Sequence, residues 1–285
     1  MKKIFIVGSV NTDLVITAPH MPEAGETIAG SDFFTARGGK GANQAVAAAR
    51  LGGKVFMCGR VGSDLFGQEA LSALKAESID VKNVRAVDDR PTGTAVIVIT
   101  DGNNRIILDK GANACLSERD IDDFLQNAMP GDIFLTQQEN PISVVGYGLK
   151  RAKEKGLFVI LNPAPADTGI LPYLSYCDLI VPNETEAEIL GGKELLLKKV
   201  PVVLTTLGEK GFEIATKDYA KAYPCIKITP VDTTAAGDTL CGGLAVKLAE
   251  GATIEQAALF GSMAASVACT KKGAQPSIPT RKEIE

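Results

Sequence analysis

The stretch VDTTAAGDT, residues 231–239, places the carboxylate of Asp238 directly behind two alanines and a glycine. Leu240, Leu244 and Leu248 follow at a spacing of four residues, which predicts one buried face of a helix. The stretch is therefore predicted to start a helix. The question is why residues with so little side chain stand at this helix start.

Two interpretations of this helix start are open. A helix start leaves several backbone N–H groups unpaired and carries the positive end of the helix dipole. In the first interpretation Thr234 caps the helix and Asp238 complements the dipole, which is the commoner arrangement. In the second, the amides of the stretch 235–237 hold a phosphoryl group and Asp238 acts on the group that attacks it.

Composition narrows the class of protein. The chain has 285 residues, of which 45% are hydrophobic, enough for one large α/β domain or two small ones. Its 30 basic and 34 acidic residues give a net charge of −4, which argues against a general surface for nucleic acid or for anionic membranes. Six scattered cysteines without a CxxC pair, with a single histidine, argue against a Cys/His metal site and are typical of reduced cytoplasmic thiols.

No targeting or membrane segment is expected. The apolar run near the N-terminus meets Asn11 and Asp13 too soon for a signal peptide. No stretch approaches the roughly 18 apolar residues of a membrane span. We expect a soluble, cytoplasmic protein that binds neither nucleic acid nor membrane.

Short β-branched runs alternate with longer helical patterns along most of the chain. Such alternation predicts parallel strands with crossover helices on both faces of a sheet. Two segments, about 12–37 and 92–109, break this rhythm as strand pairs, the second a hairpin around residues 101–104. We expect a single α/β domain, residues 1–285, that carries these two segments as a small β flap. The predicted strands are 3–8, 54–62, 132–137, 158–165, 178–183 and 201–208, and the predicted helices include 41–52 and 64–77.

A second glycine-rich stretch, ARGGKGANQAVAAARLGG, spans residues 36–53. Its glycines allow a ligand to approach the backbone, and Lys40 and Asn43 offer polar groups of the kind that a polyol needs. The stretch is neither a Walker A loop nor a dinucleotide fingerprint. A plain turn into a helix is the alternative.

Polar side chains also follow predicted strands. Asn11 and Asp13 lie on one side of an extended segment, where a carboxylate can accept two adjacent sugar hydroxyls; a turn with local hydrogen bonds is the alternative. Asn183 and Glu186 lie three residues apart at a helix start, where a capping box is the alternative. The turn TTLGEKG, residues 205–211, says little by itself.

Taken together and in this order, these motifs resemble the ribokinase-like (PfkB) family of carbohydrate kinases. GGKGANQA and TTAAGD are the two signatures of that family, and the resemblance covers about residues 4–279. It implies a ribokinase-like three-layer α/β/α sandwich with a mainly parallel central sheet and a small β-sheet lid. It also favours the second interpretation of the helix start. The motifs are GSVNTD (8–13), GGKGANQAVAAARLG (38–52), NPAPA (162–166), PNETE (182–186), TLGEKG (206–211), DTTAAGDT (232–239) and KKGAQPSIP (271–279).

The resemblance implies phosphoryl transfer from ATP to a sugar, with the 5-hydroxyl of D-ribose as the expected acceptor. Asp238 would be the general base. The anion hole would consist of Ala235, Ala236 and Gly237. The sugar would contact Asn11, Asp13, Gly39, Lys40, Asn43, Glu139 and Asp238. The ATP site would consist of Asn183, Glu186, Thr206, Leu207, Gly208, Gly237 and Ser262, with Glu186 acting on Mg²⁺ through water.

The resemblance further implies a K⁺ activator and a homodimer formed through the β lid. The K⁺ ligands, mostly carbonyl oxygens, would come from two loops, with Asp232 and Thr234 in one and Ala268, Lys271, Gly273 and Ser277 in the other. The chain departs from the family pattern in four places. Leu240 stands where the family often has Phe, Ser262 stands near the adenine where relatives carry Asn or His, segment 191–200 looks shortened, and the chain stops at Glu285 without an expected last helix.

Alternatives within the family are kinases of 2-deoxyribose, fructose or a nucleoside, and a nucleoside would need an apolar slot for its base that the sequence does not identify. The alternative from another class is a sugar-sensing protein on an inactive kinase scaffold. Such a protein would be expected to lose the base, whereas Asp238 is present.

Overall fold

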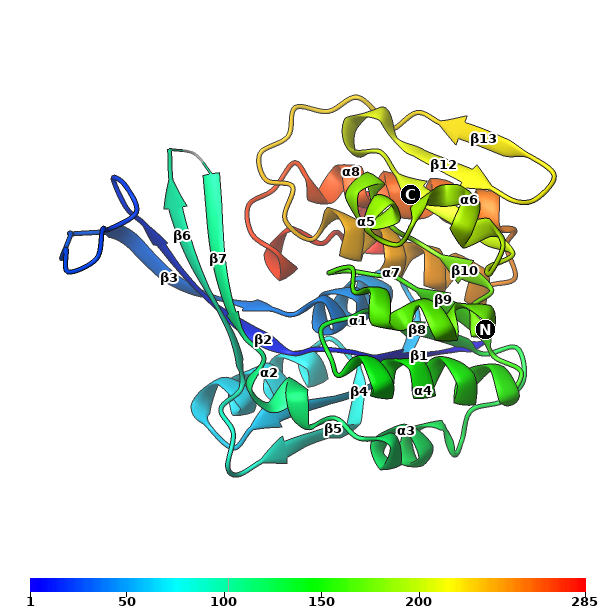
Figure 1. Cartoon of the computed structure of the whole chain (residues 1–285), viewed down its shortest axis with the longest axis horizontal. Coiled ribbons are helices and arrows are strands. Elements are labelled where there is room, and N and C mark those ends of the chain that lie inside the picture. Colours follow the sequence, from blue (N-terminus) through cyan, green and yellow to red (C-terminus); the bar gives the residue numbers. More distant parts are fainter. Residues whose placement is uncertain (102) are drawn as a thin grey trace.

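The structure is a computed structural model that describes residues 1–101 and 103–285. Within these residues the chain forms one β-sheet of nine strands and one of four. Figure 1 shows the smaller sheet projecting from one side of the body that the larger sheet forms with its helices.

The large sheet is parallel except at one edge, where β12 and β13 run antiparallel to their neighbours. Its strand order is β13-β12-β11-β10-β9-β8-β1-β4-β5. Its strands are β1 (Lys3–Val7), β4 (Lys54–Gly62), β5 (Asp80–Val87), β8 (Ile133–Thr136), β9 (Phe158–Leu161), β10 (Leu179–Ile180), β11 (Val202–Thr206), β12 (Phe212–Ala215) and β13 (Ala220–Tyr223).

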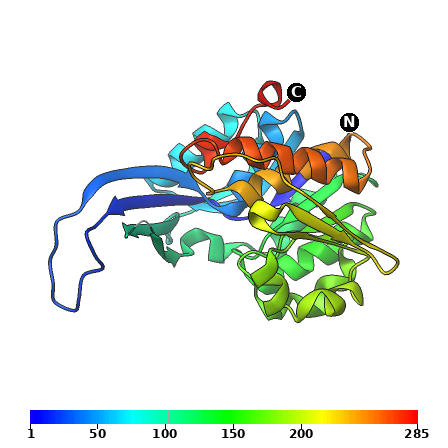
Figure 2. The same ribbon diagram turned by 90° about the horizontal axis from the view of Figure 1, so that it is seen from above.

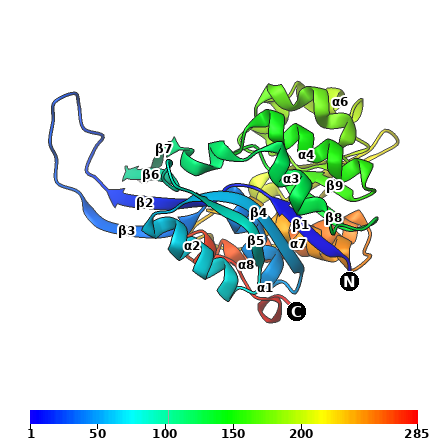
Figure 3. The same cartoon turned by 90° about the horizontal axis from the view of Figure 1, so that it is seen from below.

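Helices cover both faces of this sheet because successive side chains of its strands point to opposite sides. In β1, Ile4 and Ile6 belong to one hydrophobic core, and Phe5 and Val7 belong to the other. Figures 2 and 3 show the three layers, which confirm the predicted α/β/α sandwich. One face carries α1 (Lys40–Arg50), α2 (Leu65–Ala76), α7 (Ala236–Ala249) and α8 (Ile254–Ala268); the other carries α3 (Glu118–Leu125), α4 (Ile142–Glu154), α5 (Glu184–Ile189) and α6 (Gly192–Leu197).

Short 3₁₀ helices complete the chain. They are η1 (Gly111–Cys115), η2 (Thr168–Tyr176), η3 (Gly208–Lys210), η4 (Gln275–Ser277) and η5 (Arg281–Glu283). No helix in residues 1–101 or 103–285 is long and apolar enough to cross a membrane.

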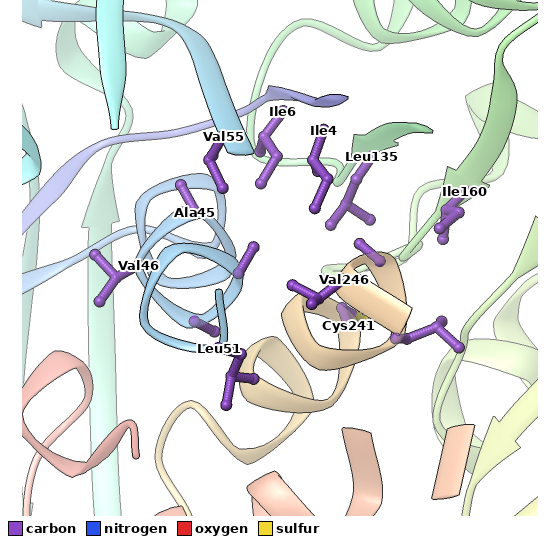
Figure 4. Close-up of a cluster of buried hydrophobic side chains, with 14 of the residues drawn as sticks. Ile4, Ile6, Ala45, Val46, Leu51, Val55, Leu135, Ile160, Cys241 and Val246 are labelled. Atoms are coloured by element: carbon purple, nitrogen blue, oxygen red, sulfur yellow. The ribbon is translucent and has the colours of Figure 1, made fainter. Parts of the chain in front are cut away.

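The core between α1, α7 and the sheet fixes how these two helices meet. Figure 4 shows side chains of α1 and α7 packed against apolar side chains of the central strands. The predicted leucine face of α7 is confirmed, with Leu240 and Leu244 buried and Leu248 packed at the edge of the same core. A Cβ at Gly242 would lie 2.5 Å from the Cβ of Ala47, so α7 approaches α1 as closely as glycine permits. This approach brings the first turn of α7 beside side chains of α1.

The small sheet has the strand order β3-β2-β6-β7, and the two segments predicted to break the α/β rhythm provide all four strands. Strands β2 and β6 join the two segments as a parallel pair. The predicted hairpin pairs Thr100 with Asn103, and Gly102 at its tip lies outside the described residues. The strands are β2 (Asn11–Thr17), β3 (Ser31–Gly38), β6 (Gly93–Thr100) and β7 (Asn103–Asp109).

Several predicted strand limits were wrong. The strand predicted over 158–165 ends at Leu161, and the one predicted over 178–183 consists of Leu179 and Ile180 alone. The hydrophobic patterns of the sequence did not predict strands β5, β12 and β13, which lie at or beside the edges of the large sheet. In β5 and β13 few side chains are buried, so no continuous apolar run marks them.

Candidate active site

The candidate site lies at the carboxyl end of the central strand β1, where the strand order of the large sheet diverges toward its two edges. Strand β1 pairs with β4 on one side and β8 on the other, and the chain continues from β4 and β8 toward opposite edges. Ligands of open α/β sheets bind at the carboxyl ends of strands at such a point. The segments that follow β1 and β8 carry Asn11 and Glu139, two of the predicted sugar ligands.

A cavity of about 230 Å³ lies beside this point and collects most of the residues predicted to act on phosphate. The predicted residues that line it are Lys40, Asn183, Glu186, Thr206, Ala235, Ala236, Gly237 and Asp238. It is also lined by five residues that sequence reasoning did not single out: Asn162, Ala164, Val181, Thr233 and Cys241. Predicted nucleotide residues Leu207, Gly208 and Ser262 do not line this cavity.

The start of α7 faces the cavity without a side-chain cap. The capping position is held by Ala235, which has the left-handed φ of 60° that costs a residue with a Cβ roughly 1–2 kcal/mol. Thr234 does not cap the helix, because its hydroxyl and its backbone N–H both donate to Asp232 Oδ1, at 2.6 and 2.9 Å. The capping role of the first interpretation is therefore wrong, and the bare start is a real feature of the fold.

Asp238 is held from α1 at both carboxylate oxygens. Asn43 Nδ2 donates to Oδ2 and Gln44 Nε2 donates to Oδ1, each at 3.0 Å, and Asp238 as a residue is only 6% exposed. Gln275 Nε2 in turn donates to Asn43 Oδ1 at 3.3 Å. The sequence analysis did not identify Gln44 or Gln275 as site residues. Gln44 could have been noticed as a polar residue in a helix whose buried face is otherwise mostly alanine. No pattern in the sequence indicates Gln275.

Lys40 provides a positive charge between three carboxylates. Burial alone would lower the pKa of its ammonium, but the surrounding carboxylates, Asp238 foremost, raise that pKa above its ordinary value. The Lys40 backbone N–H also donates to Glu139 Oε2 at 3.1 Å. The cavity therefore keeps a fixed cation beside Asp238.

Three further predicted sugar ligands are Asn11, Asp13 and Glu139, and Glu139 accepts from the Lys40 N–H. Burial, with the nearby charge of Glu139, raises the pKa of Asp13 to about 6. Asn11 Oδ1 accepts from Asn113 Nδ2 at 2.7 Å, so Asn11 presents its N–H groups to a ligand. The hydroxyl of Ser9 donates to Glu139 and orients that carboxylate. These ligands thus offer both donors and acceptors to a polyol.

Glycine is required beside these ligands. A Cβ at Gly38 would lie 2.5 Å from both carboxylate oxygens of Asp13. Gly39 has a left-handed φ of 88°, and a Cβ there would lie 2.7 Å from the backbone nitrogen of Asn11. These glycines therefore let the helix start pack against Asn11 and Asp13, and the approach of a ligand to this backbone stays a prediction.

The start of α5, in contrast, is fully capped. Asn183 Oδ1 accepts from the N–H of Glu186, and Glu186 Oε2 accepts from the N–H of Asn183, both at 2.8 Å. The capping box that was the alternative is present, and the same residues line the cavity. Burial, reinforced by Asp238, raises the pKa of Glu186 above its ordinary value in spite of the Asn183 N–H and Lys40.

The two loops predicted to enclose K⁺ are tied together at Asp232. Its Oδ2 accepts from the backbone N–H of Gly273 at 2.8 Å. Burial alone would raise the pKa of Asp232, but the hydrogen bonds from Thr234 and Gly273 hold it below its ordinary value. In the same region, the Ser277 hydroxyl donates to the Ala274 carbonyl at 2.8 Å, and Lys271 forms an ion pair with Glu283. Across residues 1–101 and 103–285, no group of three or more His, Cys, Asp or Glu side chains could hold a metal ion.

Residues 1–281 match the pfkB family carbohydrate kinases. The chain belongs to this family. It is 41% identical to the ribokinase of Haemophilus influenzae, over 99% of this chain and 97% of that protein. A ribokinase structure from Thermotoga maritima superposes with a TM-score of 0.89 at 36% identity, over 100% of this chain and 98% of that one. Arabidopsis thaliana ribokinase complexed with ribose and ATP gives a TM-score of 0.88 at 33% identity, over 99% of this chain and 97% of that one. This pfkB protein is a carbohydrate kinase.

Proposed function

We propose that this pfkB kinase transfers the γ-phosphoryl group of ATP to the 5-hydroxyl of D-ribose, giving D-ribose 5-phosphate and ADP. The observation that carries the proposal is the place of Asp238. Its carboxylate lies between the bare start of α7 and the predicted sugar ligands, and hydrogen bonds fix both of its oxygens. The ribokinase relatives, one of them complexed with ribose and ATP, support the choice of substrates.

The chemistry assigned to Asp238 is general-base catalysis. Asp238 accepts the proton of the 5-hydroxyl while that oxygen bonds to the γ-phosphorus and the bond to the β,γ-bridging oxygen breaks, so that ADP leaves. The N–H group of Gly237 and the ammonium of Lys40 stabilise the negative charge of the transferring group, whereas the Ala236 N–H donates to the Thr233 carbonyl at 3.2 Å. The proton then passes to solvent.

Recognition of ribose would follow from the donors and acceptors on the sugar side. Asp13 and Glu139 would accept from sugar hydroxyls, and Asn11 would donate to a sugar oxygen. Asn43 has a second amide hydrogen besides the one that it gives to Asp238, and this hydrogen would reach the sugar. Gly39 would contribute its backbone.

The nucleotide would occupy the cavity and the surface beyond it. Asn183 and Thr206 line the cavity, while Leu207, Gly208 and Ser262 would contact the adenosine part outside it. Glu186 fits a magnesium site because its carboxylate faces the cavity, and it would hold the hydrated ion that neutralises the phosphate charge.

A K⁺ site would lie between the two loops that Asp232 ties together. Their oxygen donors fit K⁺, which would supply a fixed positive charge behind the start of α7. The proposed ligands are Asp232, Thr234, Ala268, Lys271, Gly273 and Ser277. Replacing K⁺ in the buffer by a large organic cation should lower turnover, and equal rates in both buffers would exclude the site.

We also propose that residues 1–285 form one kinase domain, with the small sheet as a lid that pairs with the lid of a second copy. Exposed apolar side chains support the pairing, since Phe33, Ile106 and Ile107 are 63%, 60% and 66% exposed. All six cysteines are free thiols, which supports a cytoplasmic location.

A coupled assay of ADP release tests the substrate directly. Ribose, 2-deoxyribose, fructose and adenosine are compared at the same enzyme concentration. We expect the highest kcat/KM for ribose. A higher value for another sugar or for adenosine would identify the alternative kinase. Binding of a sugar without ADP release would indicate the sensing protein.

A further inference from the structure

A fully buried glutamine, Gln44, uses every polar atom of its side chain in one network. Its Nε2 donates to Asp238 Oδ1 and to Asn162 Oδ1, both at 3.0 Å. Its Oε1 accepts from Gln137 Nε2 at 2.6 Å. Gln44 is 0% exposed, so its two N–H groups and its carbonyl oxygen have protein partners and no solvent.

The network joins four elements that meet beside the cavity. Gln137 follows β8, and Asn162 follows β9, where its Nδ2 donates to the Val181 carbonyl at 2.8 Å. Gln44 lies on α1, and Asp238 lies on the first turn of α7. Residues that follow strands of the sheet therefore fix the amide of Gln44, and through its hydrogen bond this amide fixes the carboxylate of Asp238.

The two amides that hold Asp238 differ in what else they can do. Asn43 is 6% exposed and keeps an amide hydrogen for a ligand, whereas Gln44 is 0% exposed and both of its amide hydrogens are taken. Gln44 therefore cannot touch a substrate. Any influence that it has on the reaction passes through Asp238.

A carboxylate at the end of an aspartate side chain rotates easily about its last bond, because that torsion has a broad minimum. Hydrogen bonds to both oxygens remove this freedom, so the loss of the Gln44 bond to Oδ1 would leave only the Asn43 bond to Oδ2, and an amide holds the carboxylate without titrating itself. The charged groups that act on Asp238 are Lys40 of α1 and Glu186 of α5, with the Cys241 thiol in the next turn of α7. None of these groups is placed to fix the rotation as Gln44 does.

We propose that Gln44 is the positioning residue of the catalytic base: it fixes the rotation of the Asp238 carboxylate so that one oxygen faces the attacking sugar hydroxyl. This inference rests on the proposed function, in which Asp238 accepts the proton. Gln137 has the supporting role of fixing the orientation of the Gln44 amide.

Three substitutions test the inference. Gln44→Met keeps the length of the side chain and removes its hydrogen bonds, and Gln44→Glu places a second carboxylate against Asp238. Gln138→Met is the matched control, because Gln138 is equally buried and bonds only to the backbone of Asp167, at 3.1 and 3.3 Å. Circular dichroism and ADP binding by calorimetry show that each variant is folded.

We expect Gln44→Met to lower kcat by about 10²-fold, the effect of a misplaced catalytic group, with KM for ribose and ATP nearly unchanged. Gln44→Glu should lower kcat and also move the acid limb of its pH profile to higher pH, because the two carboxylates share a proton. Gln138→Met should have a lower melting temperature than the natural chain but the same kcat and the same pH profile.

Folded Gln44 variants with the turnover and the pH profile of the natural chain would overturn the inference. So would a loss of kcat in Gln138→Met as large as in Gln44→Met, because the effect would then be general core damage. If both Gln44 variants fail to fold, Gln137→Met provides the same kcat and KM comparison with the amide of Gln44 in place. An Asp238→Asn variant with full turnover would instead refute the proposed function, and this result separates the two failures.

Discussion

Two helix starts face the same cavity and are built in opposite ways. The start of α5 is closed by the reciprocal hydrogen bonds of Asn183 and Glu186, while the start of α7 has no side-chain cap and holds Ala235 in a left-handed conformation. A cap stabilises a helix by roughly 0.5–2 kcal/mol, so α7 forgoes a stabilisation that α5 keeps. The capped start presents the oxygens of a carboxylate, which suit a cation, and the bare start presents N–H groups, which suit an anion. The difference fits the proposal that the start of α5 holds the metal and the start of α7 holds the phosphoryl group.

The largest expected effect concerns the base at the bare start. Asp238→Asn keeps the shape of the side chain but cannot accept a proton, so kcat should fall by about 10²–10⁴-fold with little change in either KM. If Asp238 only complemented the helix dipole, turnover would stay near normal and stability would fall by about 0.3–1 kcal/mol. Measuring kcat and melting temperature on the same sample distinguishes these outcomes.

A second substitution makes the start of α7 resemble that of α5. Ala236→Asp adds a carboxylate that complements the helix dipole, so stability should rise by about 0.3–1 kcal/mol. The same carboxylate would occupy the phosphoryl site and repel ATP, so turnover should fall by about 10²–10³-fold. A stabilised variant that keeps its turnover would show that the bare start does not hold phosphate. The control is Asn183→Ala at the other helix, which should lose stability instead.

At the capped start, Glu186→Gln separates capping from metal binding. Glutamine can complete a capping box as glutamate does, so the melting temperature should stay nearly constant. The loss of the charge should raise the Mg²⁺ concentration needed for half-maximal rate by about 10–100-fold, as for other groups that act on a metal through water. An unchanged Mg²⁺ titration would leave Glu186 with its structural role alone.

The smallest effect is a pH dependence on the sugar side. The pKa of Asp13 is raised to about 6, so below that pH the carboxyl becomes protonated and stops accepting from sugar hydroxyls. The apparent KM for ribose should therefore rise about tenfold between pH 7 and pH 5, since only the ionised fraction binds. The KM for ATP should stay constant, and Asp13→Asn should have a high, pH-independent KM for ribose. A flat ribose KM in the natural chain would mean that Asp13 is not a ligand.

The sequence allowed the layers, the strand pairs of the small sheet and the helix start at Asp238 to be predicted, because each shows in a local pattern of residues close together in the chain. The partners of Asp238 could not be predicted in the same way. Gln44 and Gln275 reach the site from α1 and from the loop after α8, and Gln44 comes within reach only because Gly242 lets α7 approach α1. The capping box at Asn183 was visible in the sequence, but its place on the cavity wall follows from the order of the strands.

In the proposed reaction the bare start of α7 receives the transferring phosphoryl group while Asp238 takes the proton of the attacking hydroxyl. A crystal structure with ribose, ADP, Mg²⁺ and aluminium fluoride measures this most directly, because the planar fluoride occupies the place of the transferring group. We expect a fluorine atom within about 3 Å of the N–H group of Gly237, with an Asp238 oxygen within hydrogen-bond distance of the ribose 5-hydroxyl. The fluoride bound away from α7, or the 5-hydroxyl facing a different group, would contradict the claim.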